Sequence, residues 1–333
     1  MKPQRLEELL ARFSQLRIGL VGDLFLDRYL ELEPGVEEFS IETGLEAFQI
    51  SRVRNAAGAL GTIANNLLSL GVGRLVPVTV IGDDGHGFDL MNCLQHESID
   101  RSLVIRDQHR LTPTYTKPMR QNESGEWVEL NRLDVRDRCE LSEATRRAIA
   151  ENIGRMVSDV DGVIVLDQIN EPDWGVVHGD VRGELRRLSK QQPDLLIYSD
   201  SRNQIHEFDF GVVKANRDEV TRATDGRTLE ESLAEVARKT GRVVFCTCGE
   251  DGILVTDPEG RQERSATVAA TGPIDIVGAG DAASSGIVAT LLSGGAAIDA
   301  AEVGNLTASI TIEQLGCTGV ATPDQIRLRN RAP

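Results

Sequence analysis

The chain has 333 residues, of which 40% are hydrophobic and 26% are charged, enough for one large core or for a main domain with an appendage. Its 52 Asp and Glu residues outnumber its 36 Lys and Arg residues, and the resulting charge of −16 argues against nucleic acid or an anionic membrane as the main partner. The charged, amphipathic start lacks the apolar core of a signal peptide, and no run reaches the length of a membrane span. We therefore expect a soluble, cytoplasmic protein.

Short apolar runs alternate with helix-like segments along the whole chain, after an amphipathic leading helix. Strands are predicted at 17–23, 74–82, 162–167, 194–200, 210–216 and 242–249. Helices are predicted at 58–70, 142–157, 173–190 and 229–240. This alternation predicts an α/β fold with a mainly parallel sheet that carries helices on both faces. Strands that end in Asp, Asn or Gly place polar groups at the carboxyl edge of the sheet, where such folds bind ligands.

Two regions interrupt the alternation. Residues 29–56 are extended and mixed in character, and residues 113–133 read as two strands around an Asn-Glu-Ser-Gly turn. We interpret both as a small β-sheet lid inserted into a single domain that spans residues 1–333. The alternative is that they are ordinary edge strands of the main sheet.

The cysteines form no disulfide or metal framework. Cys246 and Cys248 flank Thr247 in a predicted strand, so both should point to the same face, but no second Cys or His cluster completes a metal site. Buried, reduced thiols are the favoured interpretation, and an odd, unpatterned set suits a reducing compartment. The five cysteines are Cys93, Cys139, Cys246, Cys248 and Cys317.

The segment with the clearest chemistry is Gly278-Ala279-Gly280-Asp281. It formally fits a dinucleotide fingerprint, but two helix-like segments follow it without the strand and distant acid which that fold needs, and a carboxylate would repel a bound pyrophosphate. No Gly-Lys dipeptide, His-Glu-x-x-His or Gly-x-Ser-x-Gly motif offers another assignment.

A transient anion explains the same segment. Backbone N–H groups of residues 278–281 at a helix start could stabilise a phosphoryl group in transit, while Asp281 accepts a proton from the attacking hydroxyl group. The alternative is a Gly-rich turn in which Asp281 only caps a helix. The motif alone does not decide between them.

The segment "DIVGAGD" (275–281) resembles the Asp-x-x-Gly-Ala-Gly-Asp signature of the ribokinase-like (PfkB) carbohydrate kinases, and the resemblance extends over residues 17–326. It implies a ribokinase-like fold, ATP and Mg²⁺ as cosubstrate and cofactor, and Asp281 as the general base. "KANRDEV" (214–220), "TCGEDG" (247–252) and the late helix match the nucleotide side of the family. The residues so implied are Lys214, Asn216, Glu219 (which would hold Mg²⁺, in part through water), Thr247, Gly249, Gly252 and Asn305.

On the acceptor side the resemblance implies Asp27, with Asp23 beside it, on a first strand "VGDLFLDRY" (21–29). It also implies Gly58, in a Gly-Gly segment and helix at "AGALGTIANNLLSLG" (57–71). Asp275 and Gly316 match positions near a monovalent cation, K⁺. For Asp275 the alternative is a turn-stabilising role. A homodimer formed through the lid is a further implication of the family.

Within the family the sequence is most similar to the heptose-7-phosphate kinases, as in "GDLFLDRY" and "TPTYTKPMR". It departs from the family's pattern on the acceptor side. Ala59 replaces the second glycine, Thr62 replaces a substrate-binding Asn, and "LDQINEP" (166–172) replaces a Tyr-Gly-Lys-Gly type of segment. Thr still offers a hydroxyl group, but with a shorter reach than an amide.

These observations predict a kinase for a sugar or sugar phosphate. Lys117, Arg120 and Arg132 could meet an acceptor phosphate or could be solvated charges of the lid. A nucleoside or other small-alcohol kinase is the first alternative, although aromatic residues make up only 4% of the chain. A catalytically silent sugar or nucleotide sensor is the second.

Overall fold

The computed structural model describes residues 1–223, 227–270, 272–316 and 318–331, so Cys317 lies outside the described residues. Within them, nine strands form one sheet that is parallel from β12 to β5 and ends in two antiparallel strands. In spatial order these strands are β14 (Gln262–Ser265), β13 (Ile253–Thr256), β12 (Val244–Thr247), β11 (Val212–Asn216), β10 (Leu196–Ser201), β9 (Gly162–Asp167), β1 (Arg17–Gly22), β4 (Arg74–Gly82) and β5 (Val104–Asp107). The predicted parallel α/β sheet is confirmed.

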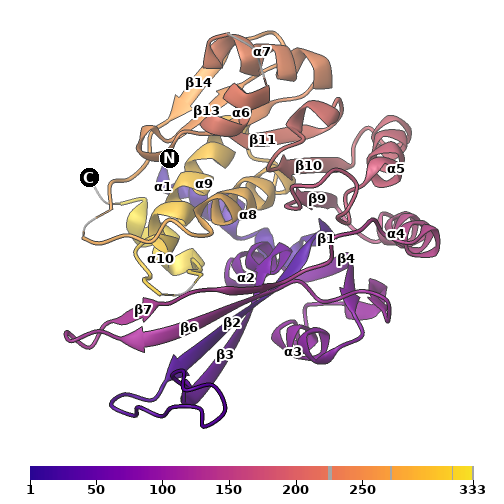
Figure 1. The fold of residues 1–333 in the computed structure, drawn as a ribbon. Helices are drawn as coiled ribbons and strands as arrows, with labels where there is room; N and C mark the ends of the chain where they lie inside the picture. The colour runs from indigo at the N-terminus through magenta and orange to yellow at the C-terminus, as the bar shows by residue number, and fades with distance from the viewer. Residues whose placement is uncertain (224–226, 271, 317, 332–333) are drawn as a thin grey trace.

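Helices cover both faces of this sheet (Figure 1). One hydrophobic core includes side chains of α1 (Pro3–Leu10), α2 (Leu60–Ser69), α3 (Gly85–Cys93), α8 (Ala279–Leu292), α9 (Ala297–Thr311) and α10 (Pro323–Arg329). A second core includes side chains of α4 (Glu143–Met156), α5 (Gly179–Gln191), α6 (Arg217–Ala223) and α7 (Leu229–Thr240). Along β9, Val163 and Val165 enter the second core while Ile164 and Leu166 enter the first, the two-residue period of a strand buried on both sides. In the described part of the chain, no helix is long and apolar enough to span a bilayer.

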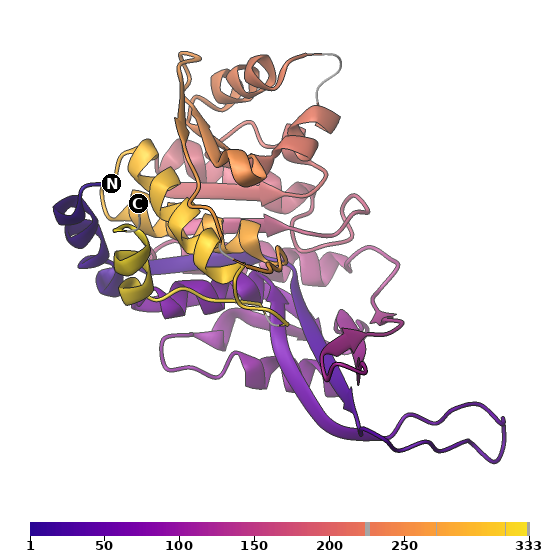
Figure 2. The same ribbon diagram turned by 90° about the vertical axis from the view of Figure 1, so that its left-hand side faces the viewer.

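The regions that interrupt the alternation form a separate sheet, at the bottom of Figure 1. Its strands are β3 (Ile50–Ala59), β2 (Leu24–Leu32), β6 (Thr114–Gln121), β7 (Trp127–Glu129) and β8 (Leu133–Val135). Figure 2 shows that the segment between β2 and β3 reaches well away from the body of the molecule. The separate small sheet is confirmed over the alternative of edge strands in the main sheet.

Three predicted boundaries were wrong. Residues 21–29 are not one strand, because β1 ends at Gly22 and β2 of the small sheet begins at Leu24. The helix predicted from Gly58 begins at Leu60, since Gly58 still pairs with β2. The helix predicted over 173–190 begins at Gly179, because a loop follows β9 and Asp173 has a φ of 62° that breaks a helix.

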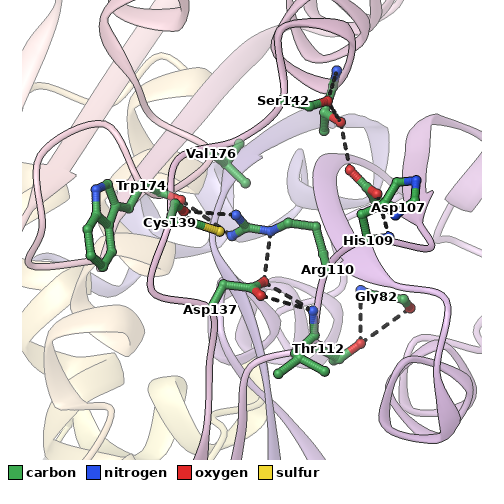
Figure 3. A network of polar contacts seen from close by, with 12 residues as sticks. Gly82, Asp107, His109, Arg110, Thr112, Asp137, Cys139, Ser142, Trp174 and Val176 are labelled. Atoms are coloured by element: carbon green, nitrogen blue, oxygen red, sulfur yellow. Dashed lines mark hydrogen bonds and ion pairs between the residues drawn. The ribbon is translucent and has the colours of Figure 1, made fainter.

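Arg110 joins the root of the small sheet to the main body (Figure 3). Its Nε lies 2.8 Å from Oδ2 of Asp137, with both side chains largely buried, and its other nitrogens donate to the backbone carbonyl groups of Cys139 and Trp174. Arg110 precedes β6, Asp137 follows β8 and Trp174 lies in the loop after β9. One guanidinium therefore fixes three segments at the point where the two sheets meet.

Ala59, where the family pattern has glycine, occupies a strained backbone conformation. It has φ 53° and ψ −114° at the start of α2, a region that residues with a Cβ atom rarely adopt.

We predict that Ala59→Gly stabilises the fold. Relief of the strain is worth roughly 1–3 kcal/mol, while the greater freedom of glycine in the unfolded chain costs about 0.5–1 kcal/mol. The midpoint of thermal unfolding should rise by roughly 2 °C. Ala57→Gly in the same strand is the control, since Ala57 is buried and has no positive φ, and it should lower the midpoint. A lower midpoint for Ala59→Gly would contradict the assigned strain.

Candidate active site

A cavity of about 290 Å³ lies between the small sheet and the carboxyl edge of the main sheet. The small sheet and its turns contribute Phe25, Asp27, Tyr115, Lys117 and Arg132. The main body contributes Thr62, Gln168, Arg202, Gly278, Asp281 and Thr318. Four residues predicted from distant parts of the sequence therefore meet here, namely Asp27, Thr62, Gly278 and Asp281. A larger cavity of about 740 Å³ opens at the amino ends of the strands and contains none of the predicted residues.

Asp281 lies in the first turn of α8 and faces this cavity. Burial raises its pKa to about 7, and the nearby negative charge of Asp200 adds to the effect, while Lys214 and Arg202 oppose it. A carboxylate with a pKa near neutrality can accept a proton from an alcohol more readily than an ordinary aspartate can.

The turn before Asp281 requires its glycines. Gly278 has a φ of 80°, and a Cβ there would come within 2.7 Å of Cγ2 of Thr318. A Cβ at Gly280 would approach Nζ of Lys214 to 3.2 Å, so the ammonium lies against the turn. The N–H of Ala279 donates to the carbonyl of Ile276 at 3.1 Å and is therefore engaged, which differs from its predicted part in the anion hole. The N–H groups of Gly280 and Asp281 precede the first hydrogen bond of the helix, which Ala282 donates to the carbonyl of Gly278. They therefore have no acceptor within the helix.

Lys214 and Asp200 form a buried ion pair behind the turn. Nζ of Lys214 lies 2.8 Å from Oδ2 of Asp200, and the two side chains are 6% and 5% exposed. Burial opposes the charge of Lys214, but the neighbouring carboxylate of Asp200 raises the pKa of Lys214, which stays an ammonium. Sequence reasoning missed Asp200. The one signal was a buried strand, β10, that runs into polar residues at its carboxyl end.

The predicted nucleotide residues gather at the ends of β11 and β12, which pair so that Asn216 lies opposite Thr247. Asn216 and Glu219 bond reciprocally, since each backbone N–H donates to the other's side-chain oxygen, at 2.7 and 2.8 Å. Gly249 has a φ of 61°. Gly252 has a φ of 78°, and a Cβ there would clash at 2.1 Å with the carbonyl oxygen of Ser265. This turn is specific to glycine, as a loop that closely approaches a ligand or another strand must be.

Asn305 bonds to the end of β14, and its part in an adenine pocket stays a prediction. Its Nδ2 donates to the carbonyl and hydroxyl oxygens of Ser265 at 2.9 and 3.0 Å, and to the carbonyl of Ala266. The side chain is buried. In this structure it ties α9 to the end of β14.

Asp27 faces the cavity from β2 and already has a partner. Its Oδ1 lies 2.8 Å from Nζ of Lys117, which also lies 3.3 Å from the hydroxyl group of Tyr29. A Cβ on Gly58 would come within 2.3 Å of Oδ2 of Asp27, so glycine is needed there to make room for the carboxylate. Gly58 thus supports Asp27 and does not itself line the cavity. Thr62 lies against Gly278, so α2 and α8 meet at the cavity.

Asp23 does not line the cavity that Asp27 faces, and its part in substrate binding stays a prediction. The carboxylate is buried and accepts three backbone N–H groups of the loop after β9, from Gln168 and Ile169 on Oδ2 and from Val176 on Oδ1, at 2.8 to 3.2 Å. These bonds fix the path of the loop after β9. Asp23 is a structural anchor.

Two arginines reach the cavity from opposite sides. Arg132 comes from the turn before β8 and is held by Asp134 at 2.6 Å and by the Tyr115 ring, while Nη2 of Arg202 donates to Oε1 of Gln168 at 2.6 Å. Arg202, at the end of β10, was missed by sequence analysis because a lone arginine after a strand carries no pattern. Arg120 contacts Glu46 and does not line the cavity.

The residues expected near a monovalent cation lie on neighbouring loops. The N–H of Asp275 donates to the carbonyl of Ile312 at 2.8 Å, and Oδ1 of Asp275 accepts the N–H of Val277. The latter bond matches the turn-stabilising alternative. Gly316 has a φ of 71° in the loop after α9. A K⁺ site here stays a prediction.

The arrangement fits a nucleotide better than a tightly bound metal. Among the described residues no group of three or more His, Cys, Asp and Glu side chains could hold an ion. The glycine turn, whose helix N–H groups and buried ammonium converge, has the chemistry of a phosphate cradle. Mg²⁺ that arrives with a nucleotide usually keeps several waters and needs few protein ligands, which Glu219 could supply.

Comparison with known proteins finds a similarity to carbohydrate kinases. The pfkB family of carbohydrate kinases matches residues 189–325. Bifunctional proteins HldE are similar over nearly all of the chain: that of Desulfatibacillum aliphaticivorans is 26% identical over 95% of this chain and 63% of its own length. That of Helicobacter pylori strain P12 is 24% identical over 94% of this chain and 66% of its own length. The chain spans about two thirds of these relatives.

Solved structures share the fold of this chain. The ribokinase of Arabidopsis thaliana, complexed with ribose and ATP, aligns with a TM-score of 0.68 at 15% identity, over 96% of this chain and 99% of its own. A putative phosphofructokinase from Staphylococcus aureus aligns with a TM-score of 0.71 at 18% identity, over 95% and 97% of the two chains. At such identities the likeness establishes a ribokinase-like fold.

The raised pKa of Asp281 predicts a pH-dependent stability cost. Below the ordinary value of 3.8 the carboxyl is protonated in both the folded and unfolded chains. As the pH rises toward 7, the unfolded chain releases this proton while the folded chain keeps it, so stability falls over that window. Asp281→Asn should therefore be more stable than the unmodified protein at pH 8, by up to about 4 kcal/mol, and the difference should shrink toward pH 5. The temperature of thermal unfolding at the two pH values measures it. If the gain in stability of the variant over the parent protein is smaller at pH 8 than at pH 5, the assignment is refuted.

Proposed function

We propose that this chain is an ATP-dependent kinase that transfers the γ-phosphoryl group of ATP to a hydroxyl group of a sugar phosphate, of the heptose phosphate class. The observation that carries the proposal is the position of Asp281. Its carboxylate, with a pKa raised to about 7, lies in the cavity beside the glycine turn and Lys214. A base, an anion cradle and a cation within one site are what phosphoryl transfer to an alcohol requires.

Each group has a distinct task in this proposal. Asp281 takes the proton of the attacking hydroxyl group. The first-turn N–H groups of α8 and the ammonium of Lys214 stabilise the charge on the transferred phosphoryl group. Mg²⁺, held through Glu219 in part by way of water, would neutralise charge on the ATP phosphates. Asp200, whose Oδ2 lies 2.8 Å from Nζ of Lys214, keeps this lysine charged and directed at the turn.

A phosphorylated acceptor is supported by the charges of the cavity. Lys117, Arg132 and Arg202 all line it, and planar guanidinium groups bind phosphate in two-point contacts. The Phe25 and Tyr115 rings, 5.4 Å apart in an edge-to-face arrangement, offer an apolar surface for a sugar ring. An uncharged nucleoside offers these cations no anionic group to bind. The likeness to HldE proteins over most of the chain supports the heptose phosphate class.

The small sheet would close over the acceptor as a lid and form the contact of a homodimer in the cytoplasm. Its exposed apolar side chains support this contact, because a water-facing sheet seldom carries so many. They are Phe39, Ile41, Leu45, Val53, Trp127, Val128 and Leu133, on the small sheet and its excursion between β2 and β3. The mass of the protein in solution tests the dimer.

We predict that Asp281→Asn folds and binds ATP but loses turnover by about 10²–10⁴-fold, because the amide cannot accept the hydroxyl proton. Release of ADP, coupled to an optical assay with a panel of sugar phosphates that includes seven-carbon sugars, measures the loss. Asp324→Asn is the matched control, since it removes a first-turn carboxylate of α10 on the surface. Near-parental turnover of Asp281→Asn would overturn the assignment of the base. No ADP release by the parent protein with any acceptor would favour the silent sensor.

Arg202→Ala should raise KM for a phosphorylated acceptor by about 10–100-fold, the effect of losing one charge-assisted hydrogen bond, and should leave KM for ATP within about threefold. Arg120→Ala is the control, because this arginine of the small sheet lies outside the cavity. Steady-state kinetics with matched phosphorylated and unphosphorylated sugars separate the effects. An equal loss with both sugars would contradict a phosphate contact.

A further inference from the structure

Cys246 and Cys248 lie in contact at the end of β12. Their sulfur atoms are 3.8 Å apart, and Thr247 alone separates the two residues in the chain. Cys246 is fully buried in the strand, while Cys248 is 8% exposed and has φ −118° and ψ 28°, which turns the chain out of the strand. Both thiols are free. Two sulfurs this close need to approach by less than 2 Å to reach the disulfide length of about 2.05 Å.

The two thiols differ in reactivity. The pKa of Cys248 is lowered to about 6, because the Cys246 side chain hydrogen-bonds its sulfur and the guanidinium of Arg217 lies beside it. The same contact, together with burial, raises the pKa of Cys246. Thiolates are the reactive species, so Cys248 is the nucleophile that an oxidant meets first. Cys246 is the resolving cysteine, which forms the disulfide with the oxidised Cys248.

We propose that Cys246 and Cys248 are a reversible oxidation site which forms an intrachain disulfide and thereby lowers the affinity of the protein for nucleotide. The effect on nucleotide rests on the proposed function, whereas the disulfide itself does not. The site is built from the 3.8 Å contact between the sulfur atoms and the neighbouring cation of Arg217, and the assigned activity uses neither thiol.

The chemistry balances with hydrogen peroxide as the oxidant. The Cys248 thiolate attacks one peroxide oxygen, the O–O bond breaks, and sulfenic acid and hydroxide form. The Cys246 thiol then attacks the Cys248 sulfur, the S–O bond breaks, and water leaves as the S–S bond forms. Two thiols and one peroxide give one disulfide and two waters. A dithiol reductant reverses the reaction by thiol–disulfide exchange.

The disulfide would act on the nucleotide edge because of what lies around it. Thr247 stands between the two cysteines and faces Asn216 on β11. The N–H of Cys248 donates to the carbonyl of Gly252 at 2.8 Å, which closes the glycine turn. When the disulfide forms, Arg217, which follows Asn216, no longer has the Cys248 thiolate beside it. Closing the short ring therefore displaces Thr247 and the turn together.

Oxidation is read out independently of activity by peptide mass. Trypsin releases residues 243–261 as one peptide that contains both cysteines, while the exposed Cys139 lies in the peptide 139–146. After treatment with hydrogen peroxide and alkylation under denaturing conditions, peptide 243–261 should be about 2 Da lighter than its dithiol form and carry no alkyl group. Dithiothreitol should restore two alkylation sites. Two alkylated cysteines after peroxide, with Cys139 oxidised, would overturn the proposal.

Variants separate the roles of the two thiols. Cys246→Ser should stop at a sulfenic acid that dimedone traps at Cys248, whereas Cys248→Ser should give no adduct in this peptide. Calorimetry should find ATP bound about tenfold more weakly by the oxidised protein, with full recovery on reduction and no disulfide-dependent loss in Cys246→Ser. Unchanged ATP affinity in the disulfide form overturns the coupling. If the reduced protein binds no ATP, the proposed function fails, while the peptide mass still decides the fate of the disulfide.

Discussion

The carboxylate of Asp23 holds together the segments on which the site depends. Its side chain accepts three N–H groups of the loop after β9, its own N–H donates to the carbonyl of Leu166, and its carbonyl accepts the N–H of Leu60. The main sheet, the start of the small sheet, the first turn of α2 and the loop that carries Gln168 therefore meet at one residue. Desolvation raises the pKa of this buried group, and the backbone donors and the charge of Arg110 oppose that effect. The cost of burying a carboxylate is offset by donors that cannot be removed by mutation of side chains.

The charged side chains at the carboxyl edge of the main sheet lie in two layers, one buried and one that lines the cavity. Asp200 and Lys214 form the inner layer and are nearly inaccessible, so their attraction is weakly screened and keeps an ammonium against the glycine turn. Asp281, Arg132 and Arg202 form the outer layer, where a ligand can reach them. The net charge of −16 thus coexists with a locally cationic cavity. A protein surface that repels polyanions can still select a small phosphorylated molecule.

The sequence was sufficient for most of the fold and for half of the site. The strand at 74–82 and the helix at 229–240 were predicted to the residue, because two-residue and 3.6-residue patterns report burial directly. The glycine turn was predictable because its backbone can be built only with glycine. Asp200 and Arg202 could not be predicted, since neither belongs to a local motif: Asp200 acts through Lys214 on the next strand, and Arg202 through its place in the cavity. The structural role of Asp23 was not predicted either: its partners are backbone groups about 145 residues away, which no local pattern reveals.

The joint between the two sheets is held mainly through the backbone of the loop after β9. Asp23 binds its N–H groups and Arg110 binds the carbonyl of Trp174, so neither contact depends on which side chains the loop carries. Side chains there can change while the path of the chain stays fixed. This explains how residues 168–170 can differ from a Tyr-Gly-Lys-Gly type of segment without loss of the cavity. The loop is accordingly a position at which acceptor preference can evolve, or be engineered, independently of folding.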